Sequence, residues 1–371
     1  MYHIPKDYLI QPNTCPSFWI NTLADVHTFL DTQIKKGHVQ TIGNSAGNRP
    51  IRAVFYGTPR QKKGTTTFSG SLGFRNIDKY LGTDANKKVY LGISGVHGGE
   101  FEGIVGTINL LSILETGHDL SGNIWPEITQ SLKNLDRIII IPVLNPDGRA
   151  RVPIQQLTYR GNDYSVFQYF NTGAWKNGEQ IGWPTCKEYI PLDFSQTEFP
   201  GGYPNDNGVN IQHDDFFGSP QPETRVLFDL TAQERPDLIL SMHTGAPLNN
   251  YHTRMYRPFI EPVLMPAWEN LYRHTHTQLT KANLQATHDI ALESDPNQQK
   301  MSVFNLDSAL NLHCGALTTI VESPCPGYAA QSRDGSYVSH TAEEILLAQL
   351  ICHQECMAYL AHTGGRIRWA K

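Results

Sequence analysis

The sequence lacks the features of membrane-spanning and nucleic-acid-binding chains. No apolar run reaches the roughly 18 residues that a membrane span needs. The net charge is -5 at pH 7 and no basic stripe is present, so we expect no nucleic-acid partner. The first residues contain no charged segment followed by an apolar stretch, which favours a cytoplasmic protein over a secreted one.

Cysteine is also scarce. The 371 residues include 6 cysteines, and their spacing contains no zinc-ribbon pair. Cys352 and Cys356 lie about one helical turn apart in a segment that we expect to be helical, from Ala342 to Leu360. We interpret them as thiols of the core, because a buried reduced cysteine behaves as a small hydrophobic residue.

No linker rich in Pro, Gly or Ser, no low-complexity tract and no internal repeat divides the chain. Its hydrophobic content of 39% is enough for one sizeable core, so we predict a single domain over residues 1–371. Residues 149–217 are rich in Gly, Pro, Asn and Asp. We predict that they form a long irregular insertion near the active site, because long loops in compact domains usually serve function.

Apolar segments that are typical of buried strands alternate with segments of helical periodicity. The expected strands are residues 52–56, 89–96, 137–144, 237–242 and 316–321, and the expected helices are residues 16–36, 104–114, 223–232 and 265–284. This alternation predicts an α/β fold with a mixed, mostly parallel, twisted sheet and helices on both of its faces.

Polar groups follow the four central strands. His97 and Glu100 come after the first, Asn145 after the second, His243 after the third and Glu322 after the fourth. In open α/β sheets, ligands bind at the carboxyl ends of the strands. Imidazole and carboxylate are donors that zinc prefers, so these residues predict a metal centre. The two glycines between His97 and Glu100 are expected to leave room for a ligand.

Each of these residues also has a simpler interpretation. Glu100 and Glu102 could merely favour the dipole of the helix that follows them. His243 could be a strand-end histidine bonded to a carbonyl group. The metal hypothesis depends on the residues acting together, and Glu102 is a rival to Glu100 as the ligand.

Together these segments resemble the zinc carboxypeptidases of the carboxypeptidase A-like type. The matching pieces are residues 42–51, His97 with Glu100, Asn145–Gly148, Gly208–Asn210, His243 and Glu322. The resemblance implies one Zn2+ per chain, held by His97, Glu100 and His243. It also implies that Glu322 is the general base.

The resemblance also concerns the cations that contact the substrate in this family. The family has an arginine after the Asn-Pro-Asp-Gly turn that stabilises the oxyanion, and Arg160 and Lys176 compete for this role. Gln212 and His213 stand where the family carries Asn-Arg to bind the terminal carboxylate of the substrate. An imidazole cannot make the two-pronged contact of a guanidinium, so selectivity for a free C-terminus is in doubt.

Other residues could then read the substrate. Asp214, with its neighbour Asp215, could bind a cationic group of the substrate. Arg225 could supply the missing carboxylate anchor, as could Arg160 or Lys176.

The leading hypothesis is zinc-dependent hydrolysis of an amide bond in a peptide. An N-acyl amino-acid deacylase or amidase of the aspartoacylase-like type is the first alternative, favoured by the missing Asn-Arg pair. A non-catalytic metal-binding protein is the second. The presence of Glu322 beside the three ligands weighs against it, because such a protein needs no base.

Overall fold

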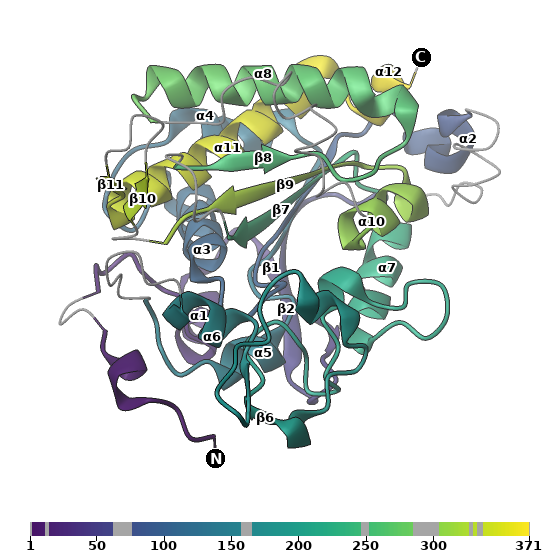
Figure 1. Ribbon diagram of the computed structural model, residues 1–371. Helices are drawn as coiled ribbons and strands as arrows, with labels where there is room; N and C mark the ends of the chain where they lie inside the picture. The colour runs from purple at the N-terminus through teal and green to yellow at the C-terminus, as the bar shows by residue number, and fades with distance from the viewer. Residues whose placement is uncertain are drawn as a thin grey trace.

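A seven-stranded sheet forms the centre of the molecule (Figure 1). The computed structural model describes residues 2–11, 15–61, 76–156, 165–245, 252–284, 304–325, 329–331 and 337–370. In sheet order the strands are β1 (His38–Asn44), β2 (Pro50–Gly57), β4 (Arg137–Ile141), β3 (Val89–Ile93), β7 (Leu238–Thr244), β9 (Leu317–Ser323) and β8 (Arg254–Tyr256). The four strands β4, β3, β7 and β9 pair in parallel. The pairs β1–β2, β2–β4 and β9–β8 are antiparallel, so the sheet is mixed.

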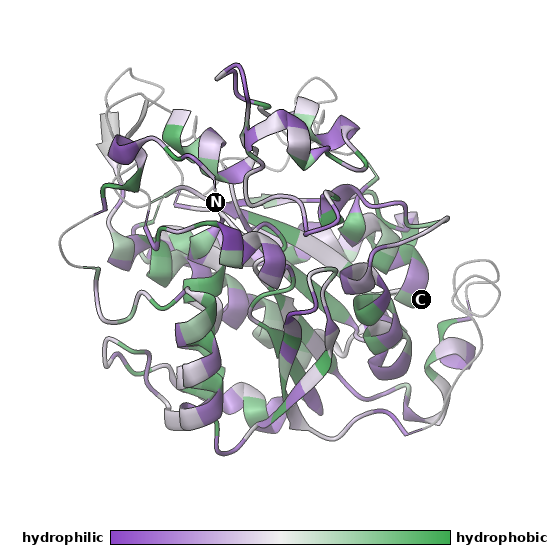
Figure 2. Ribbon diagram, turned by 90° about the horizontal axis from the view of Figure 1, so that it is seen from below, coloured by the Kyte–Doolittle hydropathy of each residue, from purple (hydrophilic) through white to green (hydrophobic). Residues whose placement is uncertain are grey.

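The central strands are buried on both faces, which explains their continuous apolar sequences. Ile138 and Ile140 of β4 pack into one hydrophobic cluster, whereas Ile139 and Ile141 pack into another. The alternation follows from the two-residue period of a strand. Figure 2 shows the hydrophobic strands between helices of mixed polarity.

Helices cover both faces of the sheet. The helices that share a cluster with Ile138 are α1 (Leu23–Gln33), α3 (Phe101–Thr116), α4 (Pro126–Asn134), α8 (Met265–Lys281) and α11 (Ala342–Thr363). Those that share a cluster with Ile139 are α2 (Ile77–Leu81), α7 (Pro222–Glu234), α10 (Leu306–Cys314) and α12 (Arg366–Trp369). The predicted fold class is therefore confirmed. No helix within the described ranges has the length and apolar character to span a bilayer.

The predicted strands all form, with shifted ends. β3 and β4 stop at Ile93 and Ile141, whereas β7 and β9 continue through His243 and Glu322. The first predicted helix begins later than expected, at Leu23, because the Thr22 side chain accepts a hydrogen bond from the backbone of Asp25 and caps it there. β1, β8, α4 and α10 are among the elements that the sequence did not predict.

Short elements build the segment from residue 149 to residue 217, which lies on one side of the sheet (Figure 1). In and next to its described parts these are α5 (Pro146–Arg151), α6 (Ser165–Asn171), β5 (Ala174–Trp175), η4 (Thr185–Glu188), η5 (Phe194–Gln196), β6 (Thr197–Phe199) and η6 (Ile211–His213). Buried aromatic residues such as Phe170 and Phe199 give it a hydrophobic cluster of its own. Aromatic packing thus holds a segment that has little regular structure.

The remaining described elements are η1 (Lys6–Leu9), η3 (Gly82–Asp84), η7 (Pro262–Leu264), β10 (Ala329–Gln331) and β11 (Tyr337–Ser339). All 6 cysteines are free thiols, and all but Cys15 are buried. Cys352 and Cys356 belong to the cluster that α11 forms with the sheet. They are core residues, as the sequence indicated.

Candidate metal centre

Three buried side chains converge at the carboxyl ends of β3 and β7. His97 lies in the loop after β3, Glu100 directly precedes α3, and His243 lies in β7. The distance from His97 Nδ1 to Glu100 Oε1 is 2.8 Å, and from His243 Nδ1 to Glu100 Oε2 it is 3.1 Å. The backbone N–H of Thr244 also donates to Glu100 Oε2, at 3.1 Å. Each oxygen of Glu100 thus faces a different imidazole.

The outer nitrogen of each imidazole has its own partner. His97 Nε2 lies 3.1 Å from Asn210 Oδ1, an oxygen that also accepts a hydrogen bond from the backbone N–H of Gln212 at 3.0 Å. His97 Nε2 therefore donates to this oxygen. His243 Nε2 lies 3.1 Å from Ser241 Oγ.

The Nδ1 atoms of both rings therefore face the same carboxylate. Metal-binding histidines are usually oriented in this way, by a hydrogen bond at the nitrogen that does not bind the metal. Tyr203 adds a further constraint, because its ring stacks on His97 with centroids 3.8 Å apart and planes 13° apart.

Electrostatics in the cluster favour a cation. Burial raises the pKa of Glu100, but the charge of His97 and the hydrogen bonds from both histidines more than offset this, so its pKa falls below the usual range. Burial and the Glu100 charge raise the pKa of Glu322. Burial lowers the pKa of His243, but the hydrogen bond to Glu100 and the charge of Glu100 outweigh burial and raise that pKa to about 9. The two buried carboxylates thus hold a positive charge beside them, and a divalent cation could take its place.

The donor atoms also fit zinc in number and chemistry. His97, Glu100 and His243 each offer an atom within 4.8 Å of the others, and the closest donor pairs are 2.8 Å and 3.1 Å apart. Tetrahedral zinc with bonds of about 2.0–2.1 Å holds its ligand atoms roughly 3.3 Å apart. Small side-chain shifts would therefore admit the ion, with one position left for water.

Glu322 lies beside this cluster. It is the register partner of His243 on β7 and of Arg254 on β8. Its Oε2 is buried and has no hydrogen-bond partner among the described residues. A Cβ at Gly245 would come within 3.1 Å of that oxygen, so the glycine keeps the space beside it open. Among the described residues, this oxygen therefore faces open space beside Gly245.

Glu102 does not join the cluster. Its Oε2 accepts a hydrogen bond from Thr244 Oγ1 at 2.7 Å, and burial raises its pKa to about 7. Between the two carboxylates that the sequence offered, the structure brings Glu100 to the histidines.

The prediction that the two glycines leave room for a ligand is wrong. A Cβ at Gly98 would lie 2.0 Å from the backbone of Gly148 and Arg149, and one at Gly99 would lie 2.2 Å from Asn171 Oδ1. The glycines are needed because other parts of the chain pack against this loop.

The Asn-Pro-Asp-Gly turn is also a packing element. The Asp147 carboxylate accepts hydrogen bonds from Ser45 Oγ, Gly47 N and Arg49 Nη1, at 2.5, 2.7 and 2.7 Å. Asn145 caps α5 and donates to the carbonyl of Tyr203 at 3.1 Å. Two of the motifs that carry the resemblance therefore bind each other.

The segment from residue 149 to residue 217 contacts the metal cluster at three points. Gly98 N donates to Gly202 O at 2.8 Å, while Tyr203 and Asn210 both contact His97. His213 is partly buried, and burial followed by the charge of Lys187 lowers its pKa to about 3. His213 is therefore neutral at pH 7. The charges of His97 and His243 lower its pKa further.

Two of the predicted substrate residues have partners within the chain. Gln212 is buried and its Nε2 donates to Asp307 Oδ2 at 2.8 Å. The oxygens of Asp214 accept hydrogen bonds from Asp215 N, Gln221 N and Thr224 Oγ1. These contacts fix the turn that precedes α7, so they are the contacts of a structural carboxylate.

The other predicted cations lie outside the cluster or outside the described residues. Arg225 is exposed on α7, and Lys176 is exposed after β5. Arg160 falls in residues 157–164, which are not among those described. Among the described residues, no contact joins Arg225 or Lys176 to the metal cluster.

Sequence reasoning missed Lys187, a cation that acts on His213. Its Nζ lies 4.3 Å from the centre of the Trp183 ring, and burial lowers its pKa. A lysine in a loop without periodicity gives no signal in a single sequence. Tyr203 was missed for the same reason, whereas Ser241 lies within a predicted strand and its contact with His243 depends on the orientation of their side chains.

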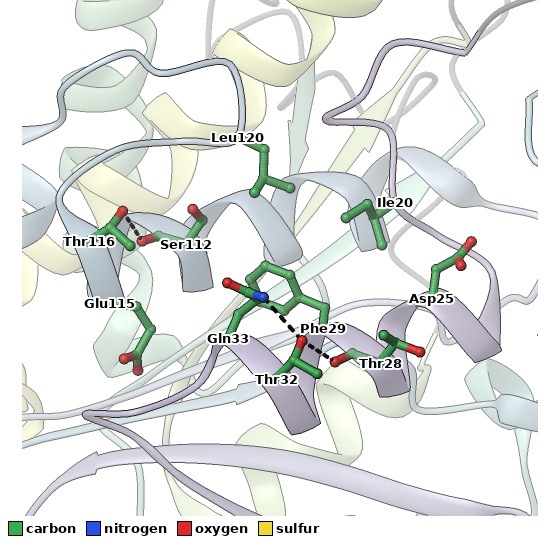
Figure 3. Close-up of a pocket in the computed structure, with 10 residues that line it drawn as sticks. All are labelled: Ile20, Asp25, Thr28, Phe29, Thr32, Gln33, Ser112, Glu115, Thr116 and Leu120. Atoms are coloured by element: carbon green, nitrogen blue, oxygen red, sulfur yellow. Dashed lines mark hydrogen bonds between the residues drawn. The ribbon is translucent and has the colours of Figure 1, made fainter.

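A pocket of about 390 Å³ lies elsewhere, between α1 and the second half of α3 (Figure 3). Its lining includes Phe29, Ser112 and Glu115. Glu100 and Glu115 are separated by about 22 Å along the chain of α3, at 1.5 Å per residue. The pocket is therefore not part of the metal cluster.

Several known structures share the fold of this chain. A metallo-carboxypeptidase from Burkholderia cenocepacia superimposes with a TM-score of 0.55 at 15% identity, covering 91% of this chain and 69% of that one. A Pseudomonas aeruginosa metallo-carboxypeptidase in complex with (2-guanidinoethylmercapto)succinic acid gives 0.52 at 13% identity, covering 91% and 68%. Bovine thrombin-activatable fibrinolysis inhibitor gives 0.54 at 10% identity, covering 94% and 99%. These likenesses show the fold.

At the level of sequence, no curated protein matches the chain significantly. The sequence model of the zinc carboxypeptidase family matches residues 30–309. This match covers most of the chain and includes His97, Glu100 and His243. The chain therefore belongs to the zinc carboxypeptidase family.

Proposed function

We propose that this protein is a zinc-dependent hydrolase that cleaves an amide bond in a peptide or an N-acyl amino acid. His97, Glu100 and His243 would hold one Zn2+ per chain, and Glu322 would be the general base. The observation that carries the proposal is the convergence of two imidazole Nδ1 atoms on Glu100, at 2.8 and 3.1 Å, with Glu322 in register beside His243.

Zinc bound at this site would activate water and polarise the scissile carbonyl group. The chain's own residues account for the remaining steps. Asn210 and Ser241 orient the two imidazoles, and Tyr203 holds the plane of His97. Glu322 accepts a proton at its unpaired Oε2 and later returns it to the leaving amine.

Substrate recognition differs from that of a typical member of the family. Gln212 is bonded to Asp307, and His213 is neutral, so neither offers a charged fork to a carboxylate. We propose Lys187 as the cation that binds the substrate carboxylate. It is half-buried, its Nζ lies 4.3 Å from the centre of the Trp183 ring, and its charge lowers the pKa of His213, which stands at the position of the family's arginine. Arg160 and Lys176 remain the candidates for stabilising the oxyanion, and Arg225 remains a weaker candidate for the anchor.

The lack of a charged fork at Gln212 and His213 also supports a second candidate function. A deacylase or amidase acting on N-acyl amino acids needs no guanidinium anchor of the carboxypeptidase kind. The distinguishing experiment is a panel of peptides with free and blocked C-termini and of N-acyl amino acids, assayed with zinc and with chelator. Turnover of peptides with free C-termini supports the peptidase, and turnover of N-acyl amino acids alone supports the deacylase. Zinc binding without any turnover would overturn both.

A further inference from the structure

A second cluster of metal-binding side chains lies apart from the first. His252 lies two residues before β8, His340 follows β11, and Glu344 lies in the first turn of α11. The rings of His252 and His340 have centroids 4.3 Å apart, and His252 Nε2 lies 3.6 Å from Glu344 Oε2. None of these residues belongs to the centre formed by His97, Glu100 and His243.

His340 is the unusual member of this cluster. Only 1% of its surface is exposed, and neither of its ring nitrogens has a hydrogen-bond partner among the described residues. A neutral imidazole offers one N–H and one lone pair, and burying both without partners is costly. Buried polar groups are nearly always satisfied in native proteins, so a missing partner at His340 needs an explanation.

We propose that His252, His340 and Glu344 form a second binding site for a divalent cation of the zinc type. Two imidazoles and one carboxylate are a donor set that zinc prefers. The three residues each present an atom within 4.8 Å of the others. A lone pair of His340 directed at the ion would satisfy one of its two unpartnered nitrogens.

The geometry leaves the site open to water. The side chain of Glu344 is 45% exposed, so a fourth position can be filled from solvent. Glu344 Oε2 also accepts a hydrogen bond from the backbone N–H of Thr341 at 2.9 Å, as part of the capping box of α11. A carboxylate has a second oxygen, so it can cap the helix and bind an ion at the same time.

The position of the cluster indicates a structural ion. His252 is two residues from Arg254, the register partner of Glu322 across β8 and β9. Glu344 belongs to the start of α11, a long helix of the main hydrophobic cluster. An ion here would join the segment that enters β8 to the start of α11, close to the strand that carries the proposed base.

Metal stoichiometry of the full-length protein tests the proposal. Equilibrium dialysis against Zn2+ should give two equivalents for the wild type. His340→Asn should retain one equivalent, and a double variant His97→Asn with His243→Asn should also retain one. His362→Asn is the matched control, because it removes an exposed histidine from the same helix and should retain two.

A second variant keeps the test decisive if His340→Asn does not fold. Glu344→Gln retains an oxygen that can cap α11 but lacks the charge, so the second equivalent should bind at least about tenfold more weakly. Binding of Co2+ to the His97→Asn, His243→Asn double variant should give the visible absorption of a four-coordinate site. The proposal is overturned if the wild type binds one equivalent, or if Glu344→Gln binds both as tightly as the wild type. A failed peptidase assay would not affect either result.

Discussion

Replacing Glu322 with Gln should abolish most turnover while leaving the fold and the zinc site intact. The residue is in β9 and is paired through its backbone with both β7 and β8, so the change of one side-chain atom does not alter the strand. The Oε2 atom has no partner among the described residues, so no hydrogen bond within that part of the chain is lost there. The substitution removes the ability to accept a proton and little else.

The expected loss of activity follows from the usual contribution of a general base to the rate. A positioned general base contributes about 100- to 10,000-fold to the rate. A loss of 100-fold in kcat corresponds to about 2.7 kcal/mol in the activation free energy. The negative charge of Glu322 also acts on His243, so a modest fall in zinc affinity is expected in addition.

The assay is kcat and KM on the best substrate of the panel, at saturating zinc, with zinc content measured on the same sample. The kcat should fall by at least about 100-fold and KM should change little, because the base acts in the chemical step. Glu343→Gln is the matched control, since it neutralises an exposed carboxylate in the first turn of α11. Near wild-type kcat in a zinc-loaded Glu322→Gln protein would refute the assignment.

Three further predictions address the surroundings of the site. Asn210→Ala should weaken zinc binding by about 10- to 100-fold in a chelator competition, because it removes the oxygen that orients an imidazole, whereas Asn210→Asp should not weaken it. Lys187→Met should lower kcat/KM at least about tenfold for substrates with a free carboxylate, and Lys176→Met should not; equal effects would exclude the proposed anchor. Glu115 accepts hydrogen bonds from three backbone N–H groups of residues 35–37, which outweigh the effect of burial and lower its pKa. Glu115 therefore stabilises the folded state at pH values above its unfolded-state pKa of about 4.3. This stabilisation is lost as the pH falls through the lower pKa that Glu115 has in the folded state. In urea unfolding, Glu115→Gln should cost about 1.5–3 kcal/mol at pH 7 and progressively less below pH 4.

The sequence was sufficient for the sheet and for the metal cluster because both depend on strong local patterns. β3, β4, β7 and β9 are buried on both faces, so their sequences are continuously apolar. His97 and His243 then follow or end such strands, and parallel strands bring their carboxyl ends to one edge. The positions of these residues could therefore be predicted without knowing how the loops fold.

The surroundings of the cluster could not be obtained in this way. Tyr203 contacts His97 only after a distant segment packs against the loop that follows β3. The glycines after His97 looked like space for a ligand, but residues 148, 149 and 171 fill it. β8 is only three residues long, too short for a pattern, yet it brings Arg254 beside Glu322.

The central claim is that His97, Glu100 and His243 hold a zinc ion. Its most direct test is a crystal structure of the zinc-loaded protein with anomalous data collected at the zinc edge. The account predicts an anomalous peak about 2.0–2.2 Å from Nδ1 of His97, Nδ1 of His243 and an oxygen of Glu100. Zinc-loaded crystals without a peak at this position, or with the three side chains turned away from one another, would contradict it.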